Sequence, residues 1–224
     1  YEIYAWDFIG HGKSAHKHAG ERYHFVDLVP FVDAAIQSIG RKDIILVGHS
    51  MGAGASALYA GSVGECIQKL ILIEGGVPIT ETPKKTAEAL GDSVRFFRKS
   101  WQSLKSPVYK NFGDMVKIRM RINSLSQSAA HTLVKRAAVK TRGGYKWRAD
   151  FRLRAPSLVR LTDLQVMDIV QKITVPTLVV LATQGIKELK IIVDKKNKLF
   201  PRAKLNILEG HHHLHMEKPV ALVE

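Results

Sequence analysis

The sequence predicts an α/β fold, in which helices flank a mostly parallel sheet and a long helical segment is inserted into the sheet. Short runs of aliphatic and β-branched residues alternate with helical patterns, as expected for parallel strands joined by helices. The run 44–47 is apolar at every position, which is typical of a strand buried on both faces. A basic stretch, 82–165, interrupts this alternation and is predicted to be a separate layer.

Five strands are expected, each a short apolar run bounded by turn residues: 3–6, 44–47, 69–74, 177–182 and 203–208. Helices are expected where apolar residues recur at helical spacing or where small residues follow a strand. They cover residues 23–39, 53–60, 94–101, 129–139, 162–170 and 186–200. We expect Gly40 to end the first helix, and Gly143 with Gly144 to form a turn in the basic stretch.

The alternation divides the chain into two parts of one core and an insertion between them. The core is predicted at 1–81 and 166–224, and the insertion, a basic helical cap, at 82–165. Parallel sheets place their ligand sites at the carboxyl ends of the strands. Because the insertion follows the third strand, we expect it to cover that edge as a lid.

The net charge of +14 is concentrated in the cap. Residues 84–160 hold 19 Lys and Arg against four acids, whereas the rest of the chain is nearly neutral. This pattern indicates either weak attraction of an anionic substrate or surface, or simply solvated outer faces of helices. Aromatic residues are too sparse among the basic ones to favour nucleic acid as a partner.

Cysteine content and hydropathy limit the classes of protein. Cys66 is the single cysteine, so a disulfide framework is excluded, and no apolar run approaches the roughly 18 residues of a membrane span. We expect an intracellular protein, cytoplasmic or peroxisomal, with a small-molecule partner. The chain has no initiator Met, starts within a strand pattern and stops within a helix pattern, so we expect an internal fragment.

A Gly48-x-Ser50-x-Gly52 pattern lies between the strand at 44–47 and the small residues of 53–60. Three fixed positions can occur by chance, but a buried strand, a sharp turn and a helix are the context that a nucleophile elbow requires. Residues without a Cβ allow strand and helix to approach closely. We therefore expect Ser50 to be a nucleophile, and the backbone N–H of Met51 to be a donor to an oxyanion.

With these motifs in hand, the chain resembles the α/β-hydrolase fold family over nearly its whole length. The resemblance is carried by Asp7-x-x-Gly10-His11-Gly12-x-Ser14, by Gly48-His49-Ser50-Met51-Gly52, by the helical cap and by the histidine-rich stretch 210–219. The cap segment 143–162 is similar to the serine hydrolase-like (kraken-type) branch. The resemblance implies a serine hydrolase that cleaves an ester or related acyl bond of a small apolar substrate through an acyl-enzyme, without a cofactor.

The resemblance also implies which histidine is the base. In related chains it precedes a Glu by five residues and a Pro by seven, which selects His212, with His211 and His213 as rivals. Four histidines among positions 211–215 invite a metal interpretation. Contiguous histidines in a loop cannot all face one ion, however, and no acid or cysteine stands at ligand spacing, so no metal is predicted.

The third member of a triad is less clear from the sequence. The family usually has an Asp after the strand at 177–182, and the expected position here is not acidic. A known variation uses an acid at the end of the preceding strand, where Glu74 stands. Glu74 is therefore either the triad acid or a turn or capping residue. Glu188 and Asp194 are the fallbacks.

Other residues have both a functional and a structural interpretation. Trp101 and Phe97 either line an apolar acyl pocket or form the core of the cap. His49 is a candidate for the substrate site and is more simply explained as packing beneath the elbow, and His11 as a hydrogen-bonding turn residue. A dehalogenase would need Asp at position 50, so the remaining alternative is a hydrolase-fold protein that binds or regulates without turnover.

The resemblance implies segments outside residues 1–224. In the family's sheet order the strand at 3–6 does not neighbour the strand at 44–47. The first strands, and an upstream His-Gly loop with the second oxyanion donor, would therefore be missing. We expect an N-terminally incomplete chain that by itself neither folds stably nor hydrolyses esters.

Overall fold

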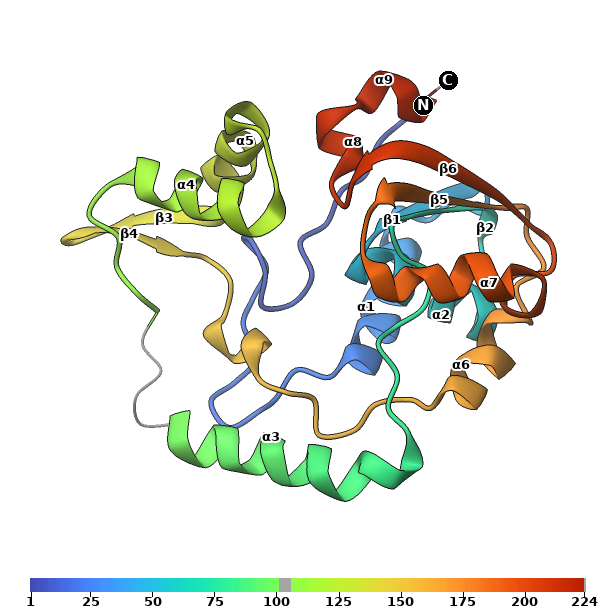
Figure 1. Cartoon of the computed structure of the whole chain (residues 1–224), viewed down its shortest axis with the longest axis horizontal. Coiled ribbons are helices and arrows are strands. Elements are labelled where there is room, and N and C mark those ends of the chain that lie inside the picture. The colour runs from blue at the N-terminus through green and yellow to red at the C-terminus, as the bar shows by residue number, and fades with distance from the viewer. Residues whose placement is uncertain (101–105, 224) are drawn as a thin grey trace. The chain divides into compact units, whose positions relative to one another are not determined.

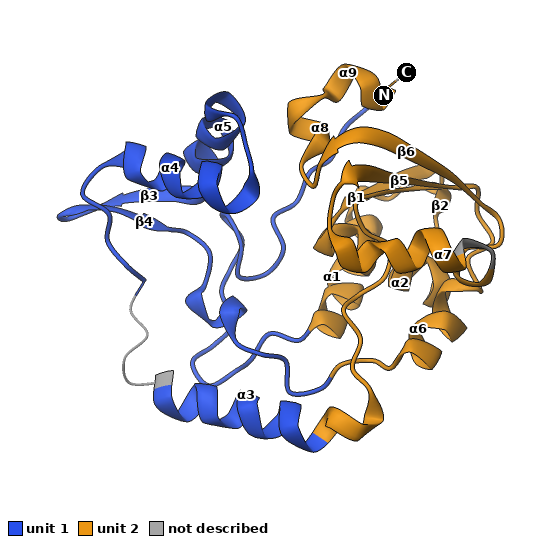
Figure 2. Cartoon of the chain, in the orientation of Figure 1, with its two compact units in different colours: residues 1–24, 87–159 blue, residues 25–86, 160–224 orange. Residues whose placement is uncertain are grey.

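In the computed structural model, residues 1–100 and 106–223 are described. The chain forms two compact units (Figure 2). The sheet unit comprises residues 25–86 and 160–224, and the hairpin unit comprises residues 1–24 and 87–159. The predicted division into core and cap at residues 81 and 165 stays a prediction.

A four-stranded parallel sheet forms the centre of the sheet unit (Figure 1). Its order is β1-β2-β5-β6, with bounds Ile44–His49, Ile67–Ile73, Thr177–Gln184 and Ala203–His211. Every pairing is parallel. Parallel neighbours require crossover connections, which helices provide here. The predicted mostly parallel sheet flanked by helices is confirmed.

Helices precede, connect and follow the strands of the sheet unit. They are α1 (Leu28–Ile39), α2 (Met51–Ser62), α6 (Asp163–Val170), α7 (Lys190–Leu199), α8 (Leu214–Glu217) and α9 (Pro219–Val223). Helix α2 contacts β1, β2, α1 and α6, and its residues from Ala53 to Ala60 are all buried. Small side chains allow this helix to lie close to the sheet. Gly40 ends α1 in the left-handed conformation, as expected (φ 70°).

The hairpin unit contains the helices α3 (Thr86–Ser100), α4 (Phe112–Asn123) and α5 (Gln127–Ala137), and the strands β3 (Ala138–Thr141) and β4 (Gly144–Trp147). The predicted turn at Gly143 and Gly144 joins the two strands. The prediction of helix as far as residue 139 was wrong, because Ala138 and Val139 pair with β4. Helix α4 was missed, since its mixed basic and apolar residues were not recognised as amphipathic.

The strand predicted at 3–6 is absent. Residues 1–8 have no assigned secondary structure, and Ile3 is 87% exposed. The apolar alternation there favours a strand locally, but a strand needs a hydrogen-bonded neighbour. None of the strands in the described part of the chain pairs with these residues.

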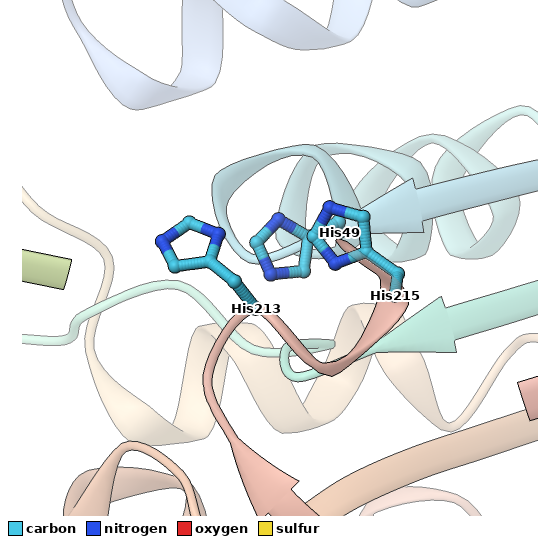
Figure 3. A group of neighbouring side chains, drawn as sticks. All are labelled: His49, His213 and His215. Atoms are coloured by element: carbon cyan, nitrogen blue, oxygen red, sulfur yellow. The ribbon is translucent and has the colours of Figure 1, made fainter. Parts of the chain in front are cut away.

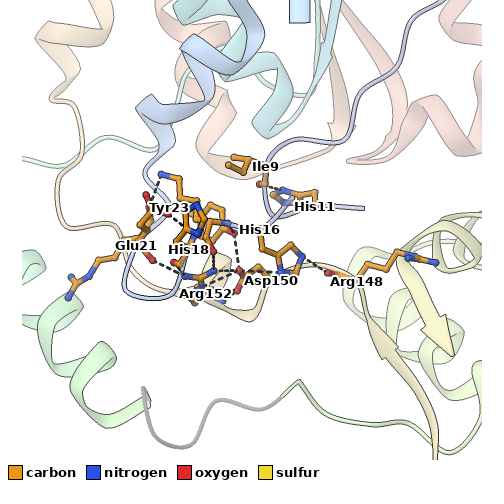
Figure 4. Close-up of polar contacts among 11 residues, drawn as sticks. Ile9, His11, His16, His18, Glu21, Tyr23, Arg148, Asp150 and Arg152 are labelled. Carbon is orange, nitrogen blue, oxygen red and sulfur yellow. Dashed lines mark hydrogen bonds and ion pairs between the residues drawn. The ribbon is translucent and has the colours of Figure 1, made fainter. Parts of the chain in front are cut away.

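A buried ion pair fixes the N-terminal loop within the hairpin unit (Figure 4). The Arg152 guanidinium donates to the Asp150 carboxylate at 2.6 Å and to the backbone carbonyls of Lys17 and His18. The Tyr23 hydroxyl donates to the same carboxylate at 2.9 Å. Burial raises the pKa of Asp150, but hydrogen bonds from Arg152 and Tyr23 outweigh it and hold that pKa below its usual value.

Two remaining features complete the fold. His11 Nδ1 lies 3.2 Å from the Ile9 carbonyl, in keeping with the structural role expected for that histidine. Among the described helices, none is both long and apolar enough to cross a membrane.

Candidate active site

Ser50 lies in a sharp turn between β1 and α2. Its backbone has φ 54° and ψ −117°, a region that residues with a Cβ rarely adopt. A Cβ at position 48 would come within 2.5–2.7 Å of the backbone of Gly52 and Ala53, so strand and helix approach as closely as the Gly-x-Ser pattern predicts. The Ser50 N–H donates to the Ile73 carbonyl at 2.9 Å, which ties the turn to the end of β2.

Ser50 is the N-cap residue of α2, and Met51 is its first residue. The N–H groups of the first helical turn have no acceptor within the helix. They carry the positive end of the helix dipole and favour negative charge nearby. The Met51 N–H is one of these groups, and its role as an oxyanion donor stays a prediction.

His212 follows β6 and contacts both Ser50 and Glu74. Its Nε2 lies 2.9 Å from Ser50 Oγ, and its Nδ1 lies 3.0 Å from Glu74 Oε2. An ionised carboxylate only accepts, so Nδ1 carries the proton and Nε2 is left to accept the Ser50 hydroxyl. Of the three candidate histidines, His212 is the one that these contacts bring to Ser50, whereas His211 is exposed at the end of β6.

Glu74 directly follows β2 and is 1% exposed. Besides the His212 contact, its carboxylate accepts the Ala182 N–H at 2.5 Å and the Ile186 N–H at 3.2 Å. The contacts fit both interpretations of Glu74. Its bond to the Ile186 N–H holds the turn after β5, as a turn residue would, and its contact with the His212 imidazole is that of a triad acid. The fallbacks, Glu188 and Asp194, have no contact with His212 within the described residues.

Gly185, in the turn after β5, lies against the carboxylate of Glu74. A Cβ added at Gly185 would collide with both carboxylate oxygens of Glu74. The resemblance implies an acid after this strand, and here the carboxylate of Glu74, which follows β2, fills the space instead. Sequence reasoning identified Glu74 but did not recognise that Gly185 leaves room for it.

His49 packs against the histidine loop, which we define as residues 211–215. Its ring centroid lies 4.1 Å from that of His215 and 4.7 Å from that of His212. Its Nε2 lies 2.8 Å from the His212 carbonyl oxygen, which fixes the backbone beside the imidazole. Burial, followed by repulsion from His215, lowers the pKa of His49 to about 3. His49 is therefore a neutral hydrogen-bond donor at physiological pH.

The comparison with known families agrees with the fold. Residues 1–219 match the model of the alpha/beta hydrolase fold family. The chain belongs to the α/β-hydrolase fold family. Helix α2, the sharp turn before it and the four parallel strands are thus the core of a hydrolase fold.

Relatives of this hydrolase-fold chain support the resemblance to the serine hydrolase-like branch. A "serine hydrolase-like protein" of Danio rerio is 23% identical over 97% of this chain and 70% of its own length. A "probable serine hydrolase" of Drosophila melanogaster is 27% identical over 97% of this chain and 69% of its own length.

Two solved structures have the same fold. A hypothetical protein of Pseudomonas aeruginosa PAO1 has a TM-score of 0.85 and is 35% identical, covering 95% of this chain and 75% of that one. A thioesterase domain from the curacin biosynthetic pathway has a TM-score of 0.80 and is 25% identical, covering 96% of this chain and 76% of that one.

The expected acyl pocket of the hydrolase is not tested by the site geometry. Trp101 lies outside the described residues. Phe97 lies in the hairpin unit, where it is 7% exposed and the Arg22 guanidinium carbon is 3.9 Å from its ring centroid. Its contacts within that unit agree with the alternative that it forms cap core, and its role toward substrate stays a prediction.

Proposed function

We propose that the protein is a serine hydrolase that cleaves an ester or related acyl bond of a small, apolar substrate through an acyl-enzyme. The observation that carries the proposal is the continuous contact from Ser50 Oγ through His212 to Glu74, at 2.9 and 3.0 Å. Nucleophile, base and orienting acid in hydrogen-bond contact are the arrangement that activates a serine.

The proposed reaction follows from the placement of the hydrogen on His212 Nδ1, which leaves Nε2 to accept a proton. His212 Nε2 removes the Ser50 proton while Oγ attacks the acyl carbon, and the resulting imidazolium is stabilised by Glu74. The oxygen that gains negative charge would face the Met51 N–H at the start of α2. His212 then returns the proton to the leaving group, which departs. Water next attacks the acyl carbon while His212 Nε2 takes its proton, and His212 returns that proton to Ser50 Oγ as the acyl–Oγ bond breaks.

The position of Glu74 argues against a binding protein without turnover. That alternative drew its support from the missing acid after β5. A buried carboxylate that accepts from His212 Nδ1 supplies what the turn after β5 lacks. It also holds the imidazole in the tautomer that a general base requires.

A fluorophosphonate probe and a panel of p-nitrophenyl esters test the proposal on the intact protein. The panel should include a short thioester, since one structural relative is a thioesterase domain. We expect labelling at Ser50, and loss of labelling and turnover in Ser50→Ala and His212→Gln, by about 10⁴-fold or more in kcat.

The matched control is His211→Gln, an exposed neighbour on the same loop. It should retain labelling and turnover within about twofold. A folded protein that neither reacts with the probe nor turns over any ester would refute the proposal and favour a binding role. Equal losses in His211→Gln and His212→Gln would contradict the assignment of the base.

A further inference from the structure

We propose that His49, His213 and His215 form a binding site for a divalent transition-metal ion such as Zn²⁺, next to Ser50 and His212. One ring nitrogen of each of the three histidines lies within 4.8 Å of the others. Figure 3 shows the three rings side by side, with His49 at the end of β1 and the other two in the histidine loop. The sequence argument considered only neighbours along the chain, and the ligand set is completed by a residue far away in the sequence.

His49 has the protonation state of a metal ligand. Its Nε2 lies 2.8 Å from the His212 carbonyl oxygen, which can only accept, so Nε2 carries the hydrogen. The Nδ1 lone pair is therefore available for coordination. A ligating imidazole whose other nitrogen donates to a backbone carbonyl is a common arrangement at metal sites, because that bond orients the ring.

His215 presents a buried nitrogen that the described residues leave without a hydrogen-bond partner. Its Nδ1 is inaccessible to solvent and has no hydrogen-bond partner within the described residues. An unsatisfied buried polar atom costs about 1–3 kcal/mol and calls for an explanation. A metal ion bound through this nitrogen would supply the missing partner.

The loop fold brings His213 and His215 to the same place. Leu214, between them, is 1% exposed and packs in the core with Ile73 and Val180. The ring centroid of His213 lies 5.2 Å from that of His49, and 5.9 Å from that of His215. Anchoring by Leu214 thus sets the loop so that its two neighbours meet the ring of His49.

The distances are somewhat wider than in a loaded site. Zn–N bonds of about 2.0–2.1 Å at tetrahedral angles place ligand nitrogens roughly 3.3 Å apart. The cluster must contract by up to about 1.5 Å, which rotations of the imidazoles can provide. Three imidazoles favour Zn²⁺, Cu²⁺ or Ni²⁺ over Mg²⁺ and Ca²⁺, which take oxygen ligands.

A metal ion here would inhibit the hydrolase, an effect that rests on the proposed function. The His212 ring centroid lies 4.7 Å from that of His49 and 4.9 Å from that of His213. A dication among these rings would repel the imidazolium that forms on His212 when Ser50 attacks. The ligand set contains no acid, so the charge of the ion would not be offset by its ligands.

Direct metal binding is the primary test, because it does not depend on activity. The intact protein, freed of metal with a chelator, is titrated with Zn²⁺ by calorimetry and with Co²⁺ by visible absorption. Wild type and Ser50→Ala should both bind one ion, with the d–d bands of a four-coordinate Co²⁺ complex. His213→Gln and His215→Gln should each weaken binding at least tenfold, whereas His211→Gln should not.

The inhibition is tested separately by ester hydrolysis with and without Zn²⁺. We expect Zn²⁺ to lower wild-type kcat reversibly, with recovery on chelation, and the concentration for half inhibition to rise at least tenfold in His215→Gln. Binding without ester hydrolysis would support the metal site and refute the hydrolase. Absence of saturable binding, or equal affinity in all three histidine variants, would overturn the metal site.

Discussion

Replacing Glu74 with Gln isolates the role of the buried acid, because the two side chains have the same shape. The carboxylate accepts from three donors, which are the N–H groups of Ala182 and Ile186 and the Nδ1–H of His212. An amide has only one accepting atom and two hydrogens of its own. At least one of the three contacts therefore becomes a clash between two donors.

Both orientations of the amide would impair His212 as the proposed base. With its NH₂ toward His212, the imidazole must present a lone pair at Nδ1, so the hydrogen moves to Nε2 and blocks acceptance from Ser50. With its oxygen toward His212, the tautomer survives, but the imidazolium loses its anionic partner. An acid-to-amide change that alters the tautomer costs about 10⁴-fold in kcat in a Ser-His-Asp protease, or about 5.5 kcal/mol.

The assay is kcat for a p-nitrophenyl ester on the intact protein, with thermal unfolding as a check on folding. Losing a hydrogen bond to a charged acceptor costs about 1.5–3 kcal/mol of stability, so Glu74→Gln should unfold earlier yet remain folded at 25 °C. Glu209→Gln is the matched control, because Glu209 lies on β6 of the same sheet with its side chain 83% exposed. A folded Glu74→Gln protein with more than about a tenth of wild-type kcat would show that Glu74 only holds the turn.

Three further predictions follow from the geometry. Gly185→Ala should displace the Glu74 carboxylate, and the loss in kcat, expressed as a free energy, should exceed the loss in the free energy of unfolding. Wild-type kcat together with an unchanged unfolding midpoint would contradict this. Gly48→Ala should destabilise the elbow by about 2 kcal/mol or more in urea unfolding, because its Cβ would overlap the start of α2. The depressed pKa of Asp150 contributes stability that is complete above the usual value of 3.8 and is lost as pH falls through the native pKa. Asp150→Asn should therefore lower the unfolding midpoint at pH 7 and flatten its decline below pH 4, and parallel pH curves for the two proteins would refute the role of its pairing with Arg152.

Features that depend on local sterics were predictable from the sequence. The elbow at Ser50 was recognised because a buried strand, two glycines and a small-residue helix can join only through a sharp turn. The order of strands and helices in the sheet unit was predictable from the hydrophobic pattern, because that pattern is also a local property of the sequence. His212 was selected by its spacing from Glu217 and Pro219, and the contacts place that residue beside Ser50.

Features that depend on partners far away in the sequence were not predictable. Residues 3–6 have a strand pattern but lack a ladder partner in the described chain. The sequence left Glu74 either as the triad acid or as a turn or capping residue, because the space left by Gly185 arises only when β2 and β5 pair. The cluster of His49 with His213 and His215 was missed since it needs the ends of β1 and β6 brought to one place.

In the proposed triad the acid stands at the end of β2 instead of in the turn after β5, which has a consequence for how such chains are recognised. A sequence search that requires Asp after the strand at 177–184 would class this chain as a homologue without a complete catalytic triad. On the proposed function, a glycine in that turn combined with an acid directly after the preceding strand is a compensating signature. Chains dismissed as inactive can be sorted again by that pair of positions before any enzyme assay is attempted.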